Sequence, residues 1–571
     1  MKNFEIAKIL EEIAVYLEMD NVQFKPRAYE KAAKAVEALD KPIEEIYRKG
    51  GKEALMEIPG VGESIAEKIA ELLTTGKLKY YEELKQKVPV DLGSFQGIEG
   101  LGPKKIKVLW QKLKIRNIDE LEKAAREHKV CNLPGFKEKT EENILKGIEF
   151  ARKSKGRYIL GFTLPLIREI ESRLNSLPEV KRAVVAGSVR RMKETIGDVD
   201  FLVISDKPSK VMDFFVSMPE VVDVMGKGET KSSVKLSNGM DADLRVVPEE
   251  SFGAALQYFT GSKDHNIALR RIAIEKGWKL SEYGLFDKKG KQIAGSSEEE
   301  VYEKLGLQWT PPEMRENTGE VELAAKGRLP TLIGYKDLRG DLQVHSNWTD
   351  GANSIREMAE EAKKLGLEYI VISDHAKSLA MTGGLDEKAM LKQGKEINRV
   401  NEQLEGIRIL KGVEANILKD GSLDLPDSIL KQLEFVAVGV HSHFNMSKEE
   451  MTKRIIKAME NEHVDYLCHP TGREIQKREP YPVDVQKIIE VAKATGTVLD
   501  IDAYPDRLDL KDEHIRFAAE IGAKLGISSD AHSKVHLHFL EFGIAQARRG
   551  WATAKDIINT LPVNKLLKVI K

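Results

Sequence analysis

The C-terminal part of the chain repeats one unit, a short apolar run that ends in residues of the metal-ligand type. YIVISDH, IRILKGVE, FVAVGVHSH, VDYLCHP and ISSDAH are examples, and the intervals between them suit one strand followed by one helix. Repeated strand–helix units close into a barrel, and side chains at the carboxyl ends of its strands gather on one face. Residues 335–571 are therefore predicted to form a barrel with histidine and carboxylate side chains clustered at one end.

The barrel takes up less than half of the 571 residues, so further domains must precede it. Residues 1–150 carry apolar residues at helical spacing, broken by glycines, which predicts an almost entirely helical region. From about residue 180, VKRAVVAGS, DVDFLVIS, SSVKLSN and ADLRVV predict strands with helices between them. Proline and glycine punctuate residues 309–334, which is typical of a linker.

Two glycine motifs in the helical region, IPGVGES and IEGLGPKK, each stand directly before an amphipathic helix. Their glycines let backbone amides at a helix N-terminus approach a phosphate closely. One such motif alone is usually a plain turn. Two copies resemble the helix-hairpin-helix motif, which binds the DNA backbone without reading bases. The resemblance implies DNA contacts, and a monovalent cation, at Gly60, Gly62, Gly100, Gly102 and Lys104.

The segments FKPRAYEKAA and GVGESIAEKIAELL resemble the lyase domain of DNA polymerase beta. By this resemblance Lys68 is the Schiff-base nucleophile, while Lys25 and Tyr29 bind a 5′-phosphate. Ser64 stands where that family has a phosphate-binding lysine. The plain alternative for Lys68 is a solvated lysine on a helix surface.

The segment GSVRRMKETIGDVDFLVIS places Asp198 and Asp200 two residues apart on an apolar strand, so both carboxylates point to one face. MDADLRVV adds Asp243 from a second strand. Three carboxylates on adjacent strands can hold two Mg²⁺ ions. A D-x-D pair alone is a weak signal, but with the GS turn and a third acidic strand it is the signature of nucleotidyltransferases, which act on many acceptors.

The following segment, ALQYFTGSKDHNIALRRIAIEKGWKLSEYGLF, resembles the thumb of the family X DNA polymerases over its whole length. This resemblance implies catalysis and metal binding by Asp198, Asp200 and Asp243. It also implies that the nucleotide is contacted by Ser188, Arg191, Gly197, Tyr258, Phe259, Asn266 and Arg270. For Tyr258 and Phe259 the alternative is simple core packing.

The C-terminal motifs VHSNWTDG, SDH, GVE, GVHSH, CHP and SDAH resemble the PHP (polymerase and histidinol phosphatase) domain. The metal ligands implied are His345, Asp350, His375, Glu414, His441, His469, Asp530 and His532. Imidazole with carboxylate suits Mn²⁺ or Zn²⁺. The first motif of the family is usually H-x-H, but the first position here is Gln343. An amide oxygen is a poorer ligand than an imidazole, so one metal ion is expected to bind more weakly. His443 lies outside the ligand set, and Arg473 is either a substrate-phosphate ligand or a surface residue.

Composition sets limits on partners and location. The formal net charge is −1, so DNA contacts must be local. Only Cys131 and Cys468 occur, which excludes a disulfide framework and favours a reducing cytosol. The N-terminus is expected to be an amphipathic helix and not a signal peptide, and no apolar run is long enough for a membrane span. The chain is expected to be a cytoplasmic, nucleoid-associated monomer that binds gapped or primed duplex DNA and dNTPs.

The predicted architecture is multidomain. Its parts are a lyase-like helix-hairpin-helix domain (1–90), a second, fingers-type helix-hairpin-helix domain (91–150), an α+β nucleotidyltransferase palm (151–248), a thumb (249–316), a linker (317–334) and a distorted (β/α)7 barrel of the PHP type (335–571). The function expected is gap-filling DNA synthesis in base excision repair, with a 3′–5′ exonuclease or 3′-end phosphoesterase and a lyase.

Two other functions fit parts of the sequence. A small-molecule phosphatase fused to a degenerate DNA-binding module would not need the intact set Asp198, Asp200 and Asp243. A nucleotidyltransferase acting on RNA or a small molecule would not need the paired DNA-binding motifs or the YFTG segment.

Overall fold

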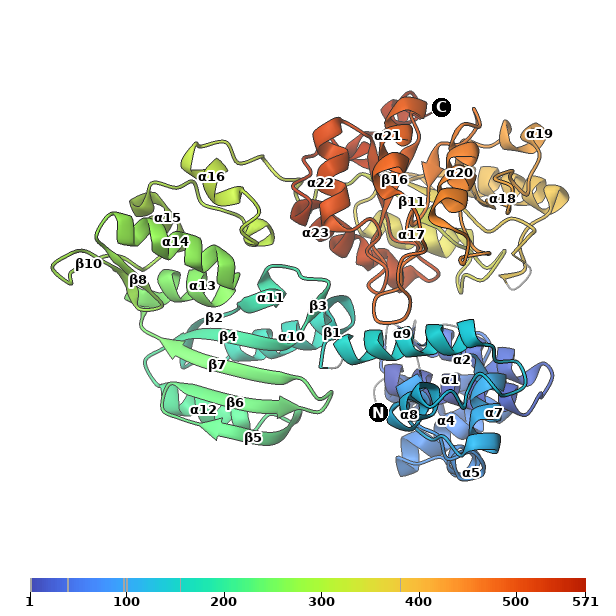
Figure 1. Ribbon diagram of the computed structural model, residues 1–571, viewed down its shortest axis with the longest axis horizontal. Coiled ribbons are helices and arrows are strands. Elements are labelled where there is room, and N and C mark those ends of the chain that lie inside the picture. The colour runs from blue at the N-terminus through green and yellow to red at the C-terminus, as the bar shows by residue number, and fades with distance from the viewer. Residues whose placement is uncertain are drawn as a thin grey trace.

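The structure is a computed structural model that describes residues 3–37, 39, 41–95, 98, 101–154, 156–379 and 382–570. A bundle of short helices, a palm sheet, a thumb and a barrel follow one another along the chain, and the long helix α9 leads from the bundle toward the palm (Figure 1). Among the described residues no helix combines the length and the apolarity needed to cross a membrane.

The helical region packs around one apolar core in which Leu10, Ala32, Ile69 and Leu109 are fully buried. Two of its helices begin directly after glycines of the repeated motifs, α4 after Gly62 and α7 after Gly102. The helices are α1 (Asn3–Met19), α2 (Lys25–Glu37), α3 (Ile43–Met56), α4 (Glu63–Thr75), α5 (Lys79–Lys87), α6 (Leu92–Phe95), α7 (Pro103–Leu113), α8 (Ile118–Arg126) and α9 (Glu138–Ser154).

The palm is a five-stranded sheet in the order β2-β4-β7-β6-β5, in which β4 and β7 run parallel. Helices α10 and α12 pack on it through a common apolar cluster. The elements are β1 (Tyr158–Ile159), α10 (Leu160–Asn175), β2 (Val180–Val185), α11 (Gly187–Arg190), β3 (Thr195–Ile196), β4 (Asp198–Ser205), α12 (Pro208–Val216), β5 (Val221–Lys227), β6 (Lys231–Leu236) and β7 (Asp241–Val247).

The thumb combines helices with a small antiparallel sheet, β10-β9-β8. Val321 and Ala324 of α16 pack into the thumb's apolar cluster, so part of the segment expected to be a linker is an ordered helix of the thumb. The elements are α13 (Phe252–Thr260), α14 (Lys263–Glu275), β8 (Lys279–Ser281), β9 (Gly284–Phe286), β10 (Gln292–Ala294), α15 (Glu298–Leu305), the 3-10 turn η2 (Pro312–Met314) and α16 (Glu320–Ala325).

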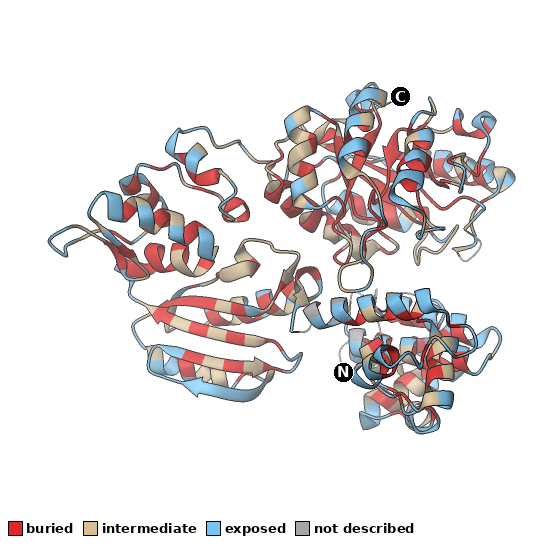
Figure 2. Ribbon diagram, viewed as in Figure 1, coloured by how far each residue is buried: buried red, intermediate tan, exposed pale blue. Residues whose placement is uncertain are grey.

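The C-terminal part is a parallel seven-stranded barrel in sequential order, as the strand–helix rhythm predicts. Its first and last strands meet where Val344 bridges to Ala531 and the His345 amide donates to the Ala531 carbonyl (2.8 Å). Ser354 and Ser447 form capping boxes at the starts of α17 and α20. The strands are buried along their length (Figure 2) because helices cover their outer face.

The strands of the barrel are β11 (Gly340–Val344), β12 (Tyr369–Ile372), β13 (Arg408–Asn416), β14 (Phe435–Gly439), β15 (Tyr466–Leu467), β16 (Val498–Asp502) and β17 (Leu525–Ser528). The helices are α17 (Ile355–Lys364), α18 (Glu387–Gln403), α19 (Asp427–Leu430), α20 (Lys448–Met459), α21 (Val485–Thr495), α22 (Asp512–Ile521), α23 (Leu540–Arg549) and α24 (Val563–Leu566), with the 3-10 turn η4 (Lys534–Phe539) before α23.

Two candidate metal centres

The palm carboxylates come together because β4 and β7 pair in register, with Asp200 opposite Asp243. Asp198 lies two residues before Asp200 and faces the same side of the sheet. Burial, followed by the charges of Asp198 and Asp243, raises the pKa of Asp200 to about 6. Neighbouring carboxylates that repel one another are stabilised in their charged form by a bound cation.

Asp243 is held differently from its neighbours. Its two oxygens accept from the Ser233 hydroxyl (2.6 Å) and pair with the Lys231 ammonium (2.9 Å). Burial alone would raise its pKa, but Ser233 and Lys231 keep it below the ordinary value. The lowered pKa keeps Asp243 in the carboxylate form, which is the form that could hold a divalent cation of the hard type.

A cavity of about 500 Å³ opens in front of Asp198 and Asp200, between palm and thumb. Gly187 has a φ of 64°, and a Cβ there would lie 2.9 Å from Asp200 Oδ2, so only glycine fits this turn. Six of the predicted nucleotide contacts line the cavity, namely Ser188, Arg191, Tyr258, Phe259, Asn266 and Arg270. Gly197 does not line it, whereas Lys263, which the sequence interpretation missed, does.

The barrel ligands form one continuous cluster at the carboxyl ends of the strands. Glu414 lies at its centre: Oε1 lies 2.9 Å from His441 Nε2 and 3.1 Å from His469 Nε2, and Oε2 lies 3.2 Å from His375 Nδ1. On the other side Asp530 Oδ1 lies 3.1 Å from His345 Nε2. The structure thus brings together residues from the carboxyl ends of six strands, β11 to β15 and β17.

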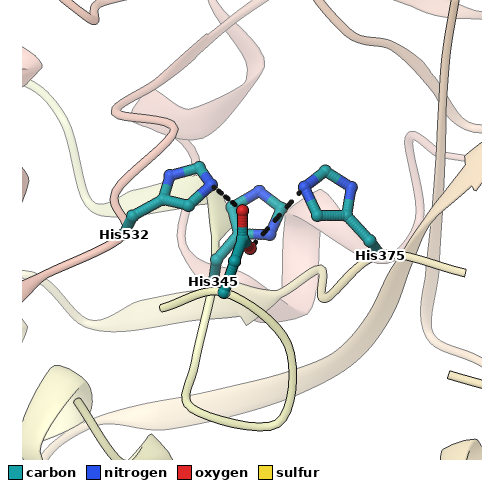
Figure 3. A group of neighbouring side chains, drawn as sticks. His345, His375 and His532 are labelled. Carbon is teal, nitrogen blue, oxygen red and sulfur yellow. Dashed lines mark ion pairs between the residues drawn. The ribbon is translucent and has the colours of Figure 1, made fainter. Parts of the chain in front are cut away.

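Figure 3 shows His345, His375 and His532 turned toward one another. Asp350 pairs with two of them, since Oδ1 lies 3.8 Å from His375 Nε2 and Oδ2 lies 3.4 Å from His532 Nε2. The His345 and His532 rings are stacked with centroids 4.3 Å apart. His469 and Asp530 have positive φ values of 31° and 48°, which is strained backbone for residues other than glycine. All eight predicted ligands are therefore in this one cluster.

Several buried polar atoms of this cluster have no hydrogen-bond partner among the described residues: Gln343 Oε1, both ring nitrogens of His345, Asp350 Oδ1, His375 Nδ1, Glu414 Oε2 and His469 Nδ1. Buried polar atoms without partners are rare and costly. Their concentration here fits a site whose missing partners are metal ions. Gln343 belongs to it, since its Nε2 donates to Asp530 Oδ1 (3.3 Å).

Comparison with known proteins identifies the family of the chain and of its parts. Four family models match: a helix-hairpin-helix domain (1–78), a SAM-like helix-hairpin-helix tandem (93–149), the DNA polymerase beta thumb (255–316) and the PHP domain (341–502). The chain is 40% identical to the DNA polymerase/3′-5′ exonuclease PolX of Bacillus subtilis (strain 168) over 98% of its own length and 97% of that protein. The chain belongs to the family X DNA polymerases with a C-terminal PHP domain.

The barrel by itself has further relatives. A protein of Thermoanaerobacter sp. (strain X514), named as a probable phosphatase, is 33% identical over 38% of this chain and 88% of its own length. A probable phosphatase of Acetivibrio thermocellus is 32% identical over 32% of this chain and 73% of its own length. In this family X polymerase the barrel thus resembles free-standing proteins.

The helix-hairpin-helix region of this polymerase has a cavity of about 800 Å³ lined by the N-terminus of α7 and the start of α2. Gly102 and Lys104 line it, together with Arg27 and the exposed Phe24. Gly60 has a φ of 82°, and at the start of α4 the N-cap residue is Gly62, which offers no side chain to cap the first backbone amides of the helix. Gly100 lies outside the described residues.

The lyase-type residues of the polymerase lie on α2 and α4. Lys68 Nζ donates to the Ser64 hydroxyl (2.9 Å) and carbonyl (3.0 Å) and lies 5.0 Å from the centre of the Tyr80 ring. Burial, opposed by Glu67 and assisted by Lys25, lowers the pKa of Lys68. Tyr29 is buried, whereas Lys25 is exposed.

Arg473 is neither a surface residue nor part of the barrel cavity. It is buried and donates two hydrogen bonds to Glu194 of the palm (3.2 and 2.5 Å). Arg507 is the arginine that lines the cavity, near Asp502 (3.6 Å) and Asp530 (3.8 Å). The signal for Arg507 was its place just after a strand end, in VLDIDAYPDR. His443 lies exposed in the loop after β14.

The barrel has a cavity of about 530 Å³ at its metal-ligand cluster, and residues from other domains of the polymerase form part of the cavity wall. Glu11, Lys34 and Glu37 of the helical region and Phe162 of the palm line it together with the metal-ligand cluster. Burial and the Glu11 carboxylate raise the pKa of Glu37. The helical region is thus placed over the entrance to the barrel site.

Proposed function

We propose that this polymerase fills short gaps during base excision repair, and that its barrel trims 3′ ends. The observation that supports DNA synthesis is the in-register pair Asp200 and Asp243, with Asp198 beside them. Asp198 and Asp200 line a cavity that the thumb also borders. The relative from Bacillus subtilis carries both activities in its name. The protein is expected to be a monomer in the cytoplasm, associated with the nucleoid.

In synthesis the three carboxylates would hold two Mg²⁺ ions. Bound there, the ions supply charge for the triphosphate and activate the primer 3′-hydroxyl. Ser188 and Arg191 would bind the phosphates, since both line the cavity beside Asp198. Tyr258 and Phe259 form an edge-to-face pair (centroids 5.2 Å) that would exclude a ribose 2′-hydroxyl. Asn266, whose amide donates to the Tyr258 carbonyl (2.7 Å), would then lie at the edge of the new base pair with Arg270.

In the barrel the eight ligands would hold Mn²⁺ or Zn²⁺, which supply a hydroxide nucleophile when bound. His441 Nδ1 lies 2.8 Å from Asn416 Oδ1, which fixes the ring and leaves Nε2 for the metal. Arg507 beside Asp502 and Asp530 is placed to contact a phosphate that enters the cavity.

A second candidate function for the barrel is removal of a 3′-phosphate instead of a nucleotide. The barrel's relatives named as probable phosphatases favour it. The same metal cluster would serve both reactions, because each breaks a phosphate ester bond with an activated water.

For the helical region we propose binding of the gap, with Lys25 near the 5′-phosphate and Lys68 as a lyase nucleophile. Support comes from the starts of α4 and α7, whose glycine N-caps provide no side-chain hydrogen bond, and from the lowered pKa of Lys68. A monovalent cation at the turn of Gly60 and Gly62 belongs to this proposal.

One experiment tests the proposed function. A 5′-labelled primer is annealed on a gapped template, with or without a 5′-phosphate on the downstream strand, and incubated with and without dNTPs in Mg²⁺ or Mn²⁺. We expect extension with dNTPs, shortening without them, and better extension when the 5′-phosphate is present. Extension that is equal on both gaps would refute the phosphate contact, and no extension on either would refute the polymerase assignment.

A further inference from the structure

Helix α23 of the barrel ends at the junction of palm and thumb. Its last residue, Arg549, is buried and donates from Nη1 to the main-chain carbonyl of Arg191 (3.0 Å) and to Glu316 Oε1 (3.2 Å). Its Nη2 donates to Asp512 of the barrel (2.6 Å). A barrel side chain therefore contacts Arg191, which lines the cavity between palm and thumb that is proposed to bind the nucleotide, here called the nucleotide cavity.

Arg191 depends on the same carboxylate. Its Nε donates to Glu316 Oε1 (3.1 Å), and its Nη1 donates to the Thr260 carbonyl at the end of α13. Lys193 also lies 3.6 Å from Glu316 Oε1. Burial alone would raise the pKa of Glu316, but Lys193, Arg191 and Arg549 lower it, so the group is a carboxylate shared by three cations.

We propose that Arg549 of the barrel is a positioning residue of the polymerase site, acting through Glu316 on the triphosphate-binding side chain of Arg191. The inference rests on the proposed role of Arg191 in nucleotide binding. A carboxylate shared with Arg549 attracts Arg191 less strongly than one that has lost this partner. With Arg549 present, the guanidinium of Arg191 can leave Glu316 for the incoming triphosphate, while its carbonyl stays fixed.

The neighbouring Arg548 provides a matched control. It lies on the same helix and pairs with another carboxylate of the thumb end, Glu313 (2.7 Å), while its guanidinium stacks on Tyr335 (5.1 Å). Its hydrogen bonds go to Glu313 and the Ile333 carbonyl, and none of these groups lines the nucleotide cavity. Arg548 thus ties the thumb to the barrel without reaching Arg191.

Steady-state extension by the full-length protein tests the proposal. Arg549→Gln should raise KM for dNTP about five- to tenfold, with kcat and barrel nuclease activity near wild type, because binding alone is weakened. Arg549→Lys keeps the positive charge, so its KM for dNTP should lie between the values of wild type and Arg549→Gln. Arg548→Gln should leave KM unchanged. An unchanged KM in Arg549→Gln, or an equal rise in Arg548→Gln, would overturn the proposal.

Glu316→Gln gives the opposite sign and keeps the test valid if Arg549→Gln does not fold. Without the competing carboxylate, Arg191 is freer, so KM should fall about threefold. Adding Arg549→Gln to this variant should then change KM no further. A structural role alone predicts a rise in KM for every variant. Arg191→Ala separates the two proposals: if it leaves KM unchanged, the nucleotide-binding role of Arg191 fails first.

Discussion

Arg315 donates two hydrogen bonds to the carboxylate of Glu298 (2.6 and 3.1 Å), and both side chains are buried. Arg190, which follows the Gly187 turn of the palm, donates two more to the same group (2.8 and 2.7 Å). Glu298 therefore joins the start of α15 in the thumb to the Gly187 turn of the palm, with one negative charge between two positive ones.

Glu298→Gln is expected to destabilise the folded protein by about 3–5 kcal/mol, because the buried guanidinium of Arg315 and the half-buried one of Arg190 lose their counter-charge. Thermal unfolding measures the effect. Glu299→Gln, at the neighbouring position of the same helix, serves as the control and should change little. A loss below about 1 kcal/mol would show that solvent reaches these arginines.

The Glu298 carboxylate should also make the free energy of unfolding depend on pH. Burial would raise the pKa of Glu298, but Arg315 and Arg190 lower it from 4.5 to about 2. As the pH falls below 4.5 the unfolded chain binds the proton first, so the stabilisation is complete above that pH and is lost on approach to pH 2. Unfolding free energies across this range should fall less steeply in Glu298→Gln than in wild type. Equal slopes would contradict the assignment.

The two metal centres should separate by mutation. Asp198→Ala or Asp243→Ala is expected to abolish primer extension and leave 3′-end trimming intact, since the barrel has its own ligands. His345→Ala, His441→Ala or His532→Ala should do the reverse. Both reactions can be followed on one gel with a 5′-labelled primer. Loss of both activities in a folded single variant would show that the centres are not independent.

The barrel should respond to the metal supplied. A mixed imidazole and carboxylate cluster binds Mn²⁺ more tightly than Mg²⁺, so trimming should need Mn²⁺ while extension proceeds in Mg²⁺. Gln343→His should lower the Mn²⁺ concentration that gives half-maximal trimming, because an imidazole replaces an amide beside Asp530. Gln343→Leu, which offers no ligand atom, is the control and should not lower it.

Lys68 is expected to be trapped by borohydride on DNA that carries a 5′-deoxyribose phosphate. Its lowered pKa increases the fraction of neutral amine, and Ser64 is its only hydrogen-bond partner in the part of the chain that the structure describes. Lys68→Ala should abolish the covalent adduct, and the exposed Lys79→Ala should not. Trapping that persists in Lys68→Ala would exclude it as the nucleophile.

Much of this architecture is readable from local pattern. Apolar runs ending in His375, Glu414 or His469 predict the barrel and the face on which its ligands gather, because strand ends of a parallel barrel coincide. Two carboxylates spaced by one residue predict a shared face. These are properties of consecutive residues, so no partner element has to be known.

Contacts between domains leave no such pattern. Arg473 looks like a free cation in HPTGRE, and its partner Glu194 is 279 positions away. Arg549 and Glu316 are separated by 233 positions, and Glu37 reaches the barrel cavity from another domain. The sequence interpretation therefore predicted the candidate ligands of each site but missed the side chains that connect the sites.

The Arg473–Glu194 contact also affects whether the barrel can be produced as a separate fragment. Leu508 and Phe542 of the barrel belong to the apolar cluster of the palm, and a Cβ on Gly161 would lie 2.5 Å from Pro505. A truncated barrel that starts near residue 335 would expose this apolar surface and strip a buried arginine of its carboxylate partner. Such a fragment is expected to aggregate or melt early. Point variants of the intact chain are the sounder route to each activity.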